Sequence, residues 1–161
     1  ATSGSVLADE ETIAGFAALM QIATIVTPNK PELEILPGRD EIADEDMFDA
    51  ARVLAERHGV QVLAKGGHAG DETQVVDRIA TPSGKLASFA HSRIETRHTH
   101  GTGCTFSSAL ATALGSGLGL SDAAGQAKRY ISAAIAAADR LTVGSGHGPV
   151  HHFHFIKGTD R

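Results

Sequence analysis

Apolar positions recur at helical spacing in the first part of the chain and alternate with short β-branched runs. Over residues 8–21 the apolar side chains fall three or four residues apart, and three acids stand where the dipole of a helix favours them. The run 24–27, halted by proline, predicts a buried strand. A short helix is predicted over 31–38, and a longer one, capped by Asp44, ends at His58-Gly59.

The pattern then changes to strands. VQVLAKGG, residues 60–67, predicts a second buried strand that ends in a glycine turn. Residues 73–80 and 85–95 are strand-like and flank a turn signal at 81–84, so they predict an antiparallel hairpin at the edge of a sheet.

Two helices and an irregular tail are predicted for the last third. A glycine loop leads into a helix with an apolar stripe of Phe106, Leu110 and Leu114, and a second helix runs from Ser121-Asp122 to about residue 141. Because helix and strand alternate over the first half, the chain is expected to form one α/β domain with a largely parallel sheet.

Composition narrows the class of protein. Of the 161 residues, 42% are apolar and 20% charged, which excludes wholesale disorder. The net charge of −5 and the scattered basic residues argue against a nucleic-acid partner, and no apolar run suits a membrane helix. One cysteine cannot form an internal disulfide, which favours the cytoplasm. The opening ATSGSVL, without an initiator Met, is expected to mark a fragment of something longer.

The loop HGTGCT is the strongest local candidate for a site. Free N–H groups at a helix start favour phosphate, and Gly101 and Gly103 allow close approach to it, while Thr102 offers a hydroxyl donor. A tight turn without a ligand fits the spacing equally well, and the loop is not a Walker A motif. Cys104 is either activated by the helix N-terminus or an inert packing residue.

Two further candidates follow predicted buried strands, where α/β sheets gather ligands. Asn29 and Glu32 could hold Mg²⁺, directly or through water; alternatively, Asn29 caps a helix and Glu32 is its first-turn acid. Lys65 could serve a phosphate as a point charge, or be a solvated lysine at a turn. The histidines of the tail lack a cysteine partner and a helical frame, so a zinc site is disfavoured.

Taken in order, six segments resemble the hydroxymethylpyrimidine/phosphomethylpyrimidine kinases of thiamine biosynthesis, in the ribokinase-like superfamily. The similarity covers nearly the whole chain. THGTGCT is its most diagnostic piece, since ribokinase-like sugar kinases usually carry aspartate where Cys104 stands; pyridoxal kinases are near neighbours. The segments are TPNKPE, VLAKGGH, Val-Val-Asp-Arg, THGTGCTFSSALA, AKRYISAAI and GHGPVHHF.

The resemblance implies a three-layer α/β/α fold with a mostly parallel central sheet and an ATP- and Mg²⁺-dependent phosphotransferase. Its substrate would be 4-amino-5-hydroxymethyl-2-methylpyrimidine and then the monophosphate. Gly101, Thr102 and Gly103 would form the anion hole for the transferring phosphoryl group, and Cys104 would be the candidate base.

In the same family match, Asn29 and Glu32 correspond to the Asn-x-x-Glu segment that organises Mg²⁺ and phosphates, and Lys65 to the lysine near the nucleotide phosphates. The hairpin and the last helices are expected to supply the adenine pocket.

By the same resemblance, residues 1–161 are the C-terminal part of a single kinase domain whose first strands are missing. This chain alone is then expected to bind pyrimidine poorly and to turn over little. The alternatives are a pyridoxal kinase and a non-catalytic fragment, either dimeric or paired with a chain that carries the missing N-terminal half.

Overall fold

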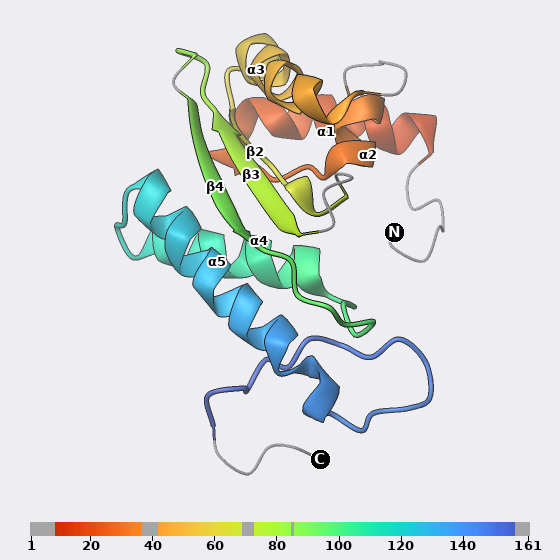
Figure 1. Cartoon of the computed structure of the whole chain (residues 1–161). Helices are drawn as coiled ribbons and strands as arrows, with labels where there is room; N and C mark the ends of the chain where they lie inside the picture. The colour runs from red at the N-terminus through yellow and green to blue at the C-terminus, as the bar shows by residue number, and fades with distance from the viewer. Residues whose placement is uncertain (1–8, 37–41, 69–72, 85, 157–161) are drawn as a thin grey trace. The chain divides into compact units, whose positions relative to one another are not determined.

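The computed structural model describes residues 9–36, 42–68, 73–84 and 86–156 (Figure 1). The chain divides into two compact units, Ala1–Arg93 and Ile94–Arg161. None of the helices within the described residues is long and apolar enough to cross a membrane.

The described residues of the first unit form a four-stranded sheet and three α-helices. Its sheet has the order β1-β2-β3-β4, and α1, α2 and α3 lie on the same side of it (Figure 1). The elements are α1 (Glu10–Ile22), β1 (Ile25–Val26), α2 (Lys30–Ile35), the 3-10 turn η1 (Asp44–Asp46), α3 (Met47–His58), β2 (Gln61–Ala64), the 3-10 turn η2 (Gly66–His68), β3 (Gln74–Ala80) and β4 (Leu86–Ser92).

The α/β class is confirmed, but the largely parallel sheet is not what the described strands form. Among these strands only β1 and β2 run parallel, with Ile25 opposite Gln61. The β2–β3 and β3–β4 pairs are antiparallel, so this part of the sheet is mixed. The physical reason lies in the two connections: nine residues separate β2 from β3, and the Thr81–Gly84 turn joins β3 to β4 as the predicted hairpin, whereas a parallel pair needs a crossover of about a dozen residues or more.

Small side chains bring α3 close to the sheet. Its buried face carries alanines together with Met47 and Leu54, and it packs on β2 and β3. The helix ends where expected, at Gly59, which takes the left-handed conformation (φ 65°) that glycine adopts without strain. The core formed there includes Val62, Ala64 and Ala80 from the strands.

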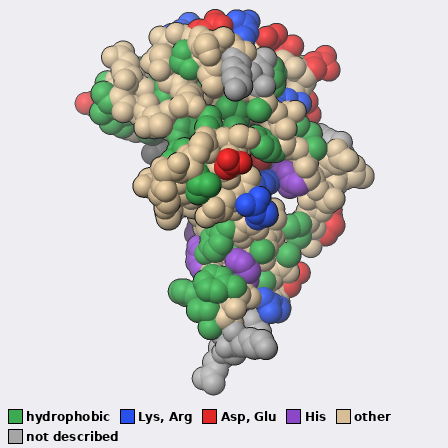
Figure 2. All heavy atoms as spheres, turned by 90° about the vertical axis from the view of Figure 1, so that its left-hand side faces the viewer, with side chains coloured by type: hydrophobic (Ala, Val, Ile, Leu, Met, Phe, Trp, Pro, Cys, Tyr) green, Lys and Arg blue, Asp and Glu red, His purple; other side chains and the backbone are tan. Residues whose placement is uncertain are grey.

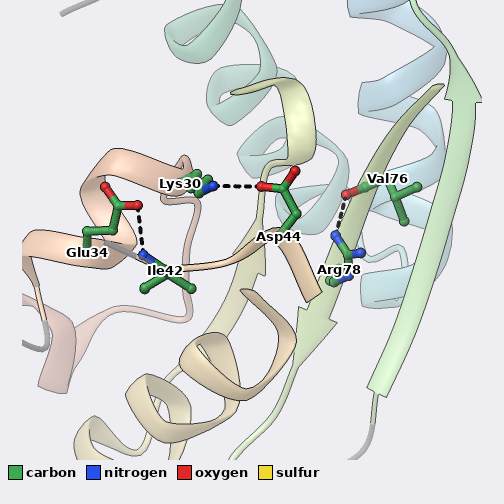
Figure 3. Close-up of polar contacts among 6 residues, drawn as sticks. All are labelled: Lys30, Glu34, Ile42, Asp44, Val76 and Arg78. Atoms are coloured by element: carbon green, nitrogen blue, oxygen red, sulfur yellow. Dashed lines mark hydrogen bonds and ion pairs between the residues drawn. The ribbon is translucent and has the colours of Figure 1, made fainter. Parts of the chain in front are cut away.

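Helix caps differ in part from the predicted ones. Asp9 caps α1, and its hydrogen bonds from Thr12 hold the pKa of the Asp9 carboxyl below its usual value. The predicted cap by Asp44 is wrong: Asp44 lies in η1, and its carboxylate pairs with Lys30 Nζ at 2.7 Å (Figure 3). The pair Pro37-Gly38, predicted to end α2, lies outside the described residues.

The second unit contains two long helices that pack against each other. They are α4 (Thr102–Gly115) and α5 (Leu120–Ala136), followed by the 3-10 turn η3 (Ala138–Arg140). The helix α5 ends before the predicted residue 141, because the chain tightens into η3. Beyond η3 the described tail forms no further helix or strand, as predicted, although Val150 and His151 are buried.

Candidate functional site

Asn29 and Lys65 lie side by side at the carboxyl ends of the two parallel strands. They form an isolated parallel bridge, and the backbone N–H of Lys65 donates to Pro28 O at 2.9 Å. The parallel pairing therefore continues past β1 and β2 and brings two of the predicted site residues together. The ends of parallel strands are where α/β sheets place ligands.

The side chains of Asn29 and Glu32 form a capping box at the start of α2. Asn29 Oδ1 accepts from the Glu32 N–H at 2.9 Å, and Glu32 Oε2 accepts from the Asn29 N–H at 2.8 Å. The capping interpretation is thus realised, and it orients both oxygens toward backbone. A carboxylate has about four lone-pair sites, so the exposed Glu32 keeps acceptor capacity for a cation or its water.

Two polar contacts tie the segment after α2 back to this helix. Besides the Lys30–Asp44 pair, the N–H of Ile42 donates to Glu34 Oε1 at 3.1 Å, and Figure 3 shows both contacts. In the same view Arg78 Nη1 donates to the carbonyl of Val76 on its own strand. Glu32 therefore lies between Lys30 and Glu34, which both contact the segment that follows α2.

The glycine turn after Lys65 is held by a buried acid. Asp77 on β3 is 3% exposed, and its Oδ1 accepts from the N–H of Gly66 at 2.9 Å. A Cβ on Gly66 would lie 2.1 Å from the carbonyl oxygen of Val76, so only glycine fits. Sequence reasoning missed Asp77, although a charged residue between the apolar Val75 and Ile79 of one strand face was a readable signal.

The Gly101–Cys104 loop starts α4 in the second unit. Gly101 is the N-cap with φ 85°, a conformation that favours glycine, and α4 begins without a side-chain cap. The N–H groups of its first turn, including those of Gly103 and Cys104, have no carbonyl partner within the helix. The Thr102 hydroxyl, expected as a donor to an anion, here donates to Thr99 O at 2.7 Å.

Cys104 faces an open cavity of about 820 Å³. The thiol is exposed, which contradicts the interpretation of this cysteine as inert buried packing. The wall of the cavity is formed by α4, α5 and the tail. Its lining residues are His100, Gly101, Cys104, Thr105, Ser108, Ala109, Thr112, Gln126, Tyr130, Pro149 and His152.

The tail anchors the loop through main-chain contacts. His100 and Pro149 form a parallel bridge in which the His100 N–H donates to Gly148 O and the Val150 N–H donates to His100 O. His98 Nδ1 accepts from the Gly148 N–H at 2.7 Å, and a Cβ on Gly148 would lie 2.6 Å from that nitrogen. The GHGPV segment is thus a structural partner of the loop, a role that spacing alone did not indicate.

The tail histidines have packing and backbone roles. His151 is buried and its N–H donates to Ala134 O, while the carbonyl of His152 accepts from the Tyr130 hydroxyl at 2.8 Å. The His154 ring packs near Tyr130, with centroids 5.3 Å apart. Within the described residues no group of three or more His, Cys, Asp or Glu side chains is placed to hold a metal ion.

Comparison with known proteins decides the family. The family model of phosphomethylpyrimidine kinase matches residues 1–151, which include the Lys65 turn and the Gly101–Cys104 loop. The chain belongs to the phosphomethylpyrimidine kinase family. The resemblance inferred from the six segments is therefore confirmed.

Two relatives and one solved structure of this kinase family and its neighbours are informative. A hydroxymethylpyrimidine/phosphomethylpyrimidine kinase from Rhizobium meliloti is 42% identical, and the match covers 96% of this chain and 58% of the relative's length. The thiamine biosynthesis bifunctional protein ThiED from Geobacter sulfurreducens is 46% identical over a match that covers 83% of this chain and 26% of that protein. The pyridoxal kinase from Staphylococcus aureus in complex with AMP-PCP superposes with a TM-score of 0.84 at 27% sequence identity, and the superposition covers 96% of this chain and 56% of that kinase.

These comparisons bear on the fold of the chain and on how much of a complete kinase it represents. The fold neighbour confirms the ribokinase-like α/β fold predicted from the sequence. The chain spans little more than half the length of the Rhizobium relative and of the pyridoxal kinase.

On the face shown in Figure 2, Lys and Arg side chains are separated from one another rather than gathered into a stripe.

Proposed function

We propose that the chain supplies the phosphoryl-transfer loop and the phosphate-binding lysine of an ATP-dependent hydroxymethylpyrimidine/phosphomethylpyrimidine kinase. The observation that carries this proposal is the family match over 1–151, combined with an exposed Cys104 at the uncapped start of α4. The reaction would phosphorylate 4-amino-5-hydroxymethyl-2-methylpyrimidine and then its monophosphate, in thiamine biosynthesis.

The loop residues have roles that follow from their geometry. The first-turn N–H groups at Gly103 and Cys104 point along the helix axis with the positive end of the dipole, and they stabilise charge on a transferring phosphoryl group. Gly101 and Gly103 leave the approach to these groups open, and rotation of the Thr102 hydroxyl away from Thr99 O adds one donor.

Cys104 is proposed to orient the substrate hydroxyl and to accept its proton. The thiolate is the form of the side chain that can accept a proton. A loose transition state asks little of a base, so positioning and charge neutralisation contribute most of the rate. The cavity beside Cys104 has room for part of a nucleotide or of the substrate.

In the first unit, Lys65 is proposed to interact with the nucleotide phosphates as a point charge, next to Asn29. Glu32 is proposed to hold Mg²⁺ through water, because its carboxylate is exposed and already oriented by the capping box. Bound Mg²⁺ would neutralise phosphate charge. ATP as the donor is supported by the AMP-PCP complex of the Staphylococcus aureus neighbour.

A pyridoxal kinase is the second candidate, favoured by that same neighbour with its TM-score of 0.84. The two are separated by an ADP-release assay on a chimera that joins the N-terminal part of the Rhizobium meliloti kinase to this chain. Faster turnover of the hydroxymethylpyrimidine than of pyridoxal supports the proposal. Faster turnover of pyridoxal contradicts it.

For pyrimidine binding and turnover, the isolated chain is proposed to need a partner, either a second copy or a polypeptide carrying the N-terminal half of the kinase domain. The outer face of α1 leaves Phe16 42%, Leu19 57% and Ile22 83% exposed, an apolar stripe that favours association. Native mass spectrometry of the purified chain, alone and mixed with the N-terminal part of the Rhizobium kinase, distinguishes a dimer, a heterodimer and a monomer. The single cysteine fits a cytoplasmic location, which we include in the proposal.

Cys104→Ala in the chimera is expected to lower kcat by about 10²-fold, the usual contribution of a positioned general base, with a smaller change in KM. Ser107→Ala, which also lies on α4 but is not among the residues that line the cavity, is the matched control and is expected to retain activity. A Cys104→Ala variant with full kcat would remove the base from the proposal.

A further inference from the structure

Asp77 is a buried acid that the proposed reaction does not use. It stands on β3 between Val75 and Ile79, in the row of side chains that share one face of the strand. A carboxylate is costly to bury unless hydrogen bonds satisfy it. One such bond is the 2.9 Å contact from the Gly66 N–H, which places the acid directly against the turn that follows Lys65.

The backbone of this turn is fixed on three sides besides the acid. The Lys65 N–H donates to Pro28 O at 2.9 Å, and the carbonyl of Gly67 accepts from Arg93 Nη1 at 3.1 Å. The Cα of Gly66 lies so close to the Val76 backbone that no side chain fits between them. Each of the three residues Lys65, Gly66 and Gly67 therefore has its own anchor.

The anchors matter because Lys65 has a flexible four-carbon stem. A lysine on a mobile turn loses freedom when it meets an anion, and a lysine on a fixed turn has already lost part of it. Lys65 is partly buried, which restricts the stem further. The ammonium group is thus presented from a rigid base, as precise binding sites require.

We propose that Asp77 is a positioning residue: by holding the Gly66 amide it fixes the turn that presents Lys65 to the phosphates of a nucleoside triphosphate. This inference rests on the proposed function for the identity of the anion. The hydrogen bond from the Gly66 N–H to Asp77, which we call the clamp, is however present in the free chain. Asp77 acts through the backbone and does not touch the ligand.

Three variants of the full 161-residue chain test the inference. Asp77→Ala removes the acceptor, and Asp77→Asn keeps an oxygen acceptor of the same shape without the charge. Val75→Ala is the matched control, because it shortens a buried side chain in the same row and leaves the Asp77 carboxylate in place. For each, amide exchange at Gly66 and Gly67 is measured by NMR, and Mg·AMP-PNP is titrated as the probe.

Asp77→Ala is expected to accelerate exchange at Gly66 relative to its neighbours and to raise the Kd of Mg·AMP-PNP by roughly tenfold. Asp77→Asn is expected to restore most of the protection and of the affinity. Val75→Ala is expected to lower the unfolding midpoint while leaving the Kd within about twofold of the wild type.

Two results overturn the inference. One is unchanged Gly66 protection in Asp77→Ala, which refutes the clamp whether or not nucleotide binds. The other is an equal loss of affinity in Asp77→Ala and Val75→Ala, which reduces Asp77 to a general contributor to stability. A third result separates the two proposals: the wild-type chain binds no nucleotide, but Asp77→Ala still accelerates amide exchange at Gly66. In that case the nucleotide of the proposed function and the phosphate ligand of Lys65 are both refuted. The hydrogen bond from Gly66 to Asp77 then still fixes the turn.

Discussion

The turns at Gly66 and at Gly101 need glycine for different physical reasons. At Gly66 the requirement is space, because a Cβ there would lie 2.1 Å from a backbone carbonyl oxygen. At Gly101 the requirement is conformation: φ is 85°, while the nearest atom to an added Cβ would be Thr105 Oγ1 at 3.9 Å. One turn is closed around its backbone, and the other opens onto a cavity.

The helices that start beside the two turns also differ, in whether side chains cap their first N–H groups. The helix α2, next to Lys65, satisfies its first N–H groups with the Asn29–Glu32 capping box. The helix α4, next to Gly101, begins without a side-chain cap. A capped start is a stable support, whereas an uncapped one retains donors for an anion. The comparison indicates that the first turn presents a side chain and the second presents its backbone.

Gly66→Ala is expected to produce the largest effect, a loss of about 3 kcal/mol or more in the free energy of unfolding, because the backbone of Val76 cannot move away from an overpacked atom. Gly67→Ala is the matched control, since a Cβ there meets nothing within 4 Å. Denaturant unfolding of both variants measures the difference. Equal stability of the two would contradict the steric account of Gly66.

Gly101→Ala is expected to cost less, about 1–2 kcal/mol, which is the strain of a left-handed conformation without a clash. Gly115→Ala, at the other end of α4 and with open space around it, is the control. Thermal unfolding followed by circular dichroism measures both. A Gly101→Ala variant as stable as Gly115→Ala would show that the loop relaxes to a different backbone.

Asn29→Ala is expected to have the smallest effect, about 1 kcal/mol, the usual value for a lost N-cap. Asn29→Asp keeps the oxygen acceptor and is expected to retain the stability. Chemical denaturation at neutral pH compares the three proteins. If removal of the cap left stability unchanged, the contrast between a capped α2 and an uncapped α4 would lose its energetic meaning.

Much of the fold could be predicted because its signals are local. The hairpin was predicted from its turn residues, and the end of α3 from Gly59. The cap by Asp44 was wrongly predicted, since its partner Lys30 is 14 residues away and the choice between a cap and an ion pair is a tertiary one. The mixed sheet was missed for a similar reason: alternation of helices and strands suggests parallel pairing but does not give the direction of β3.

The candidate site could be located but not fully described from sequence. Gly101 and Cys104 were identified from one contiguous segment, and Asn29 and Lys65 from two strand ends. Asp77 acts on Gly66 from a different strand, and pairing of this kind depends on sheet register. For the same reason, the contact of His98 with Gly148 across 50 residues had no local signature.

The central claim is that the loop ending in Cys104 binds the phosphates of a nucleotide during phosphoryl transfer. Cys104 is the only cysteine and its thiol is exposed, so its alkylation by iodoacetamide reports on this loop alone. Saturating Mg·AMP-PNP is expected to slow the alkylation by about fivefold or more, since bound ligand shields the thiol and changes its electrostatic surroundings. An alkylation rate that does not change with nucleotide would contradict the claim.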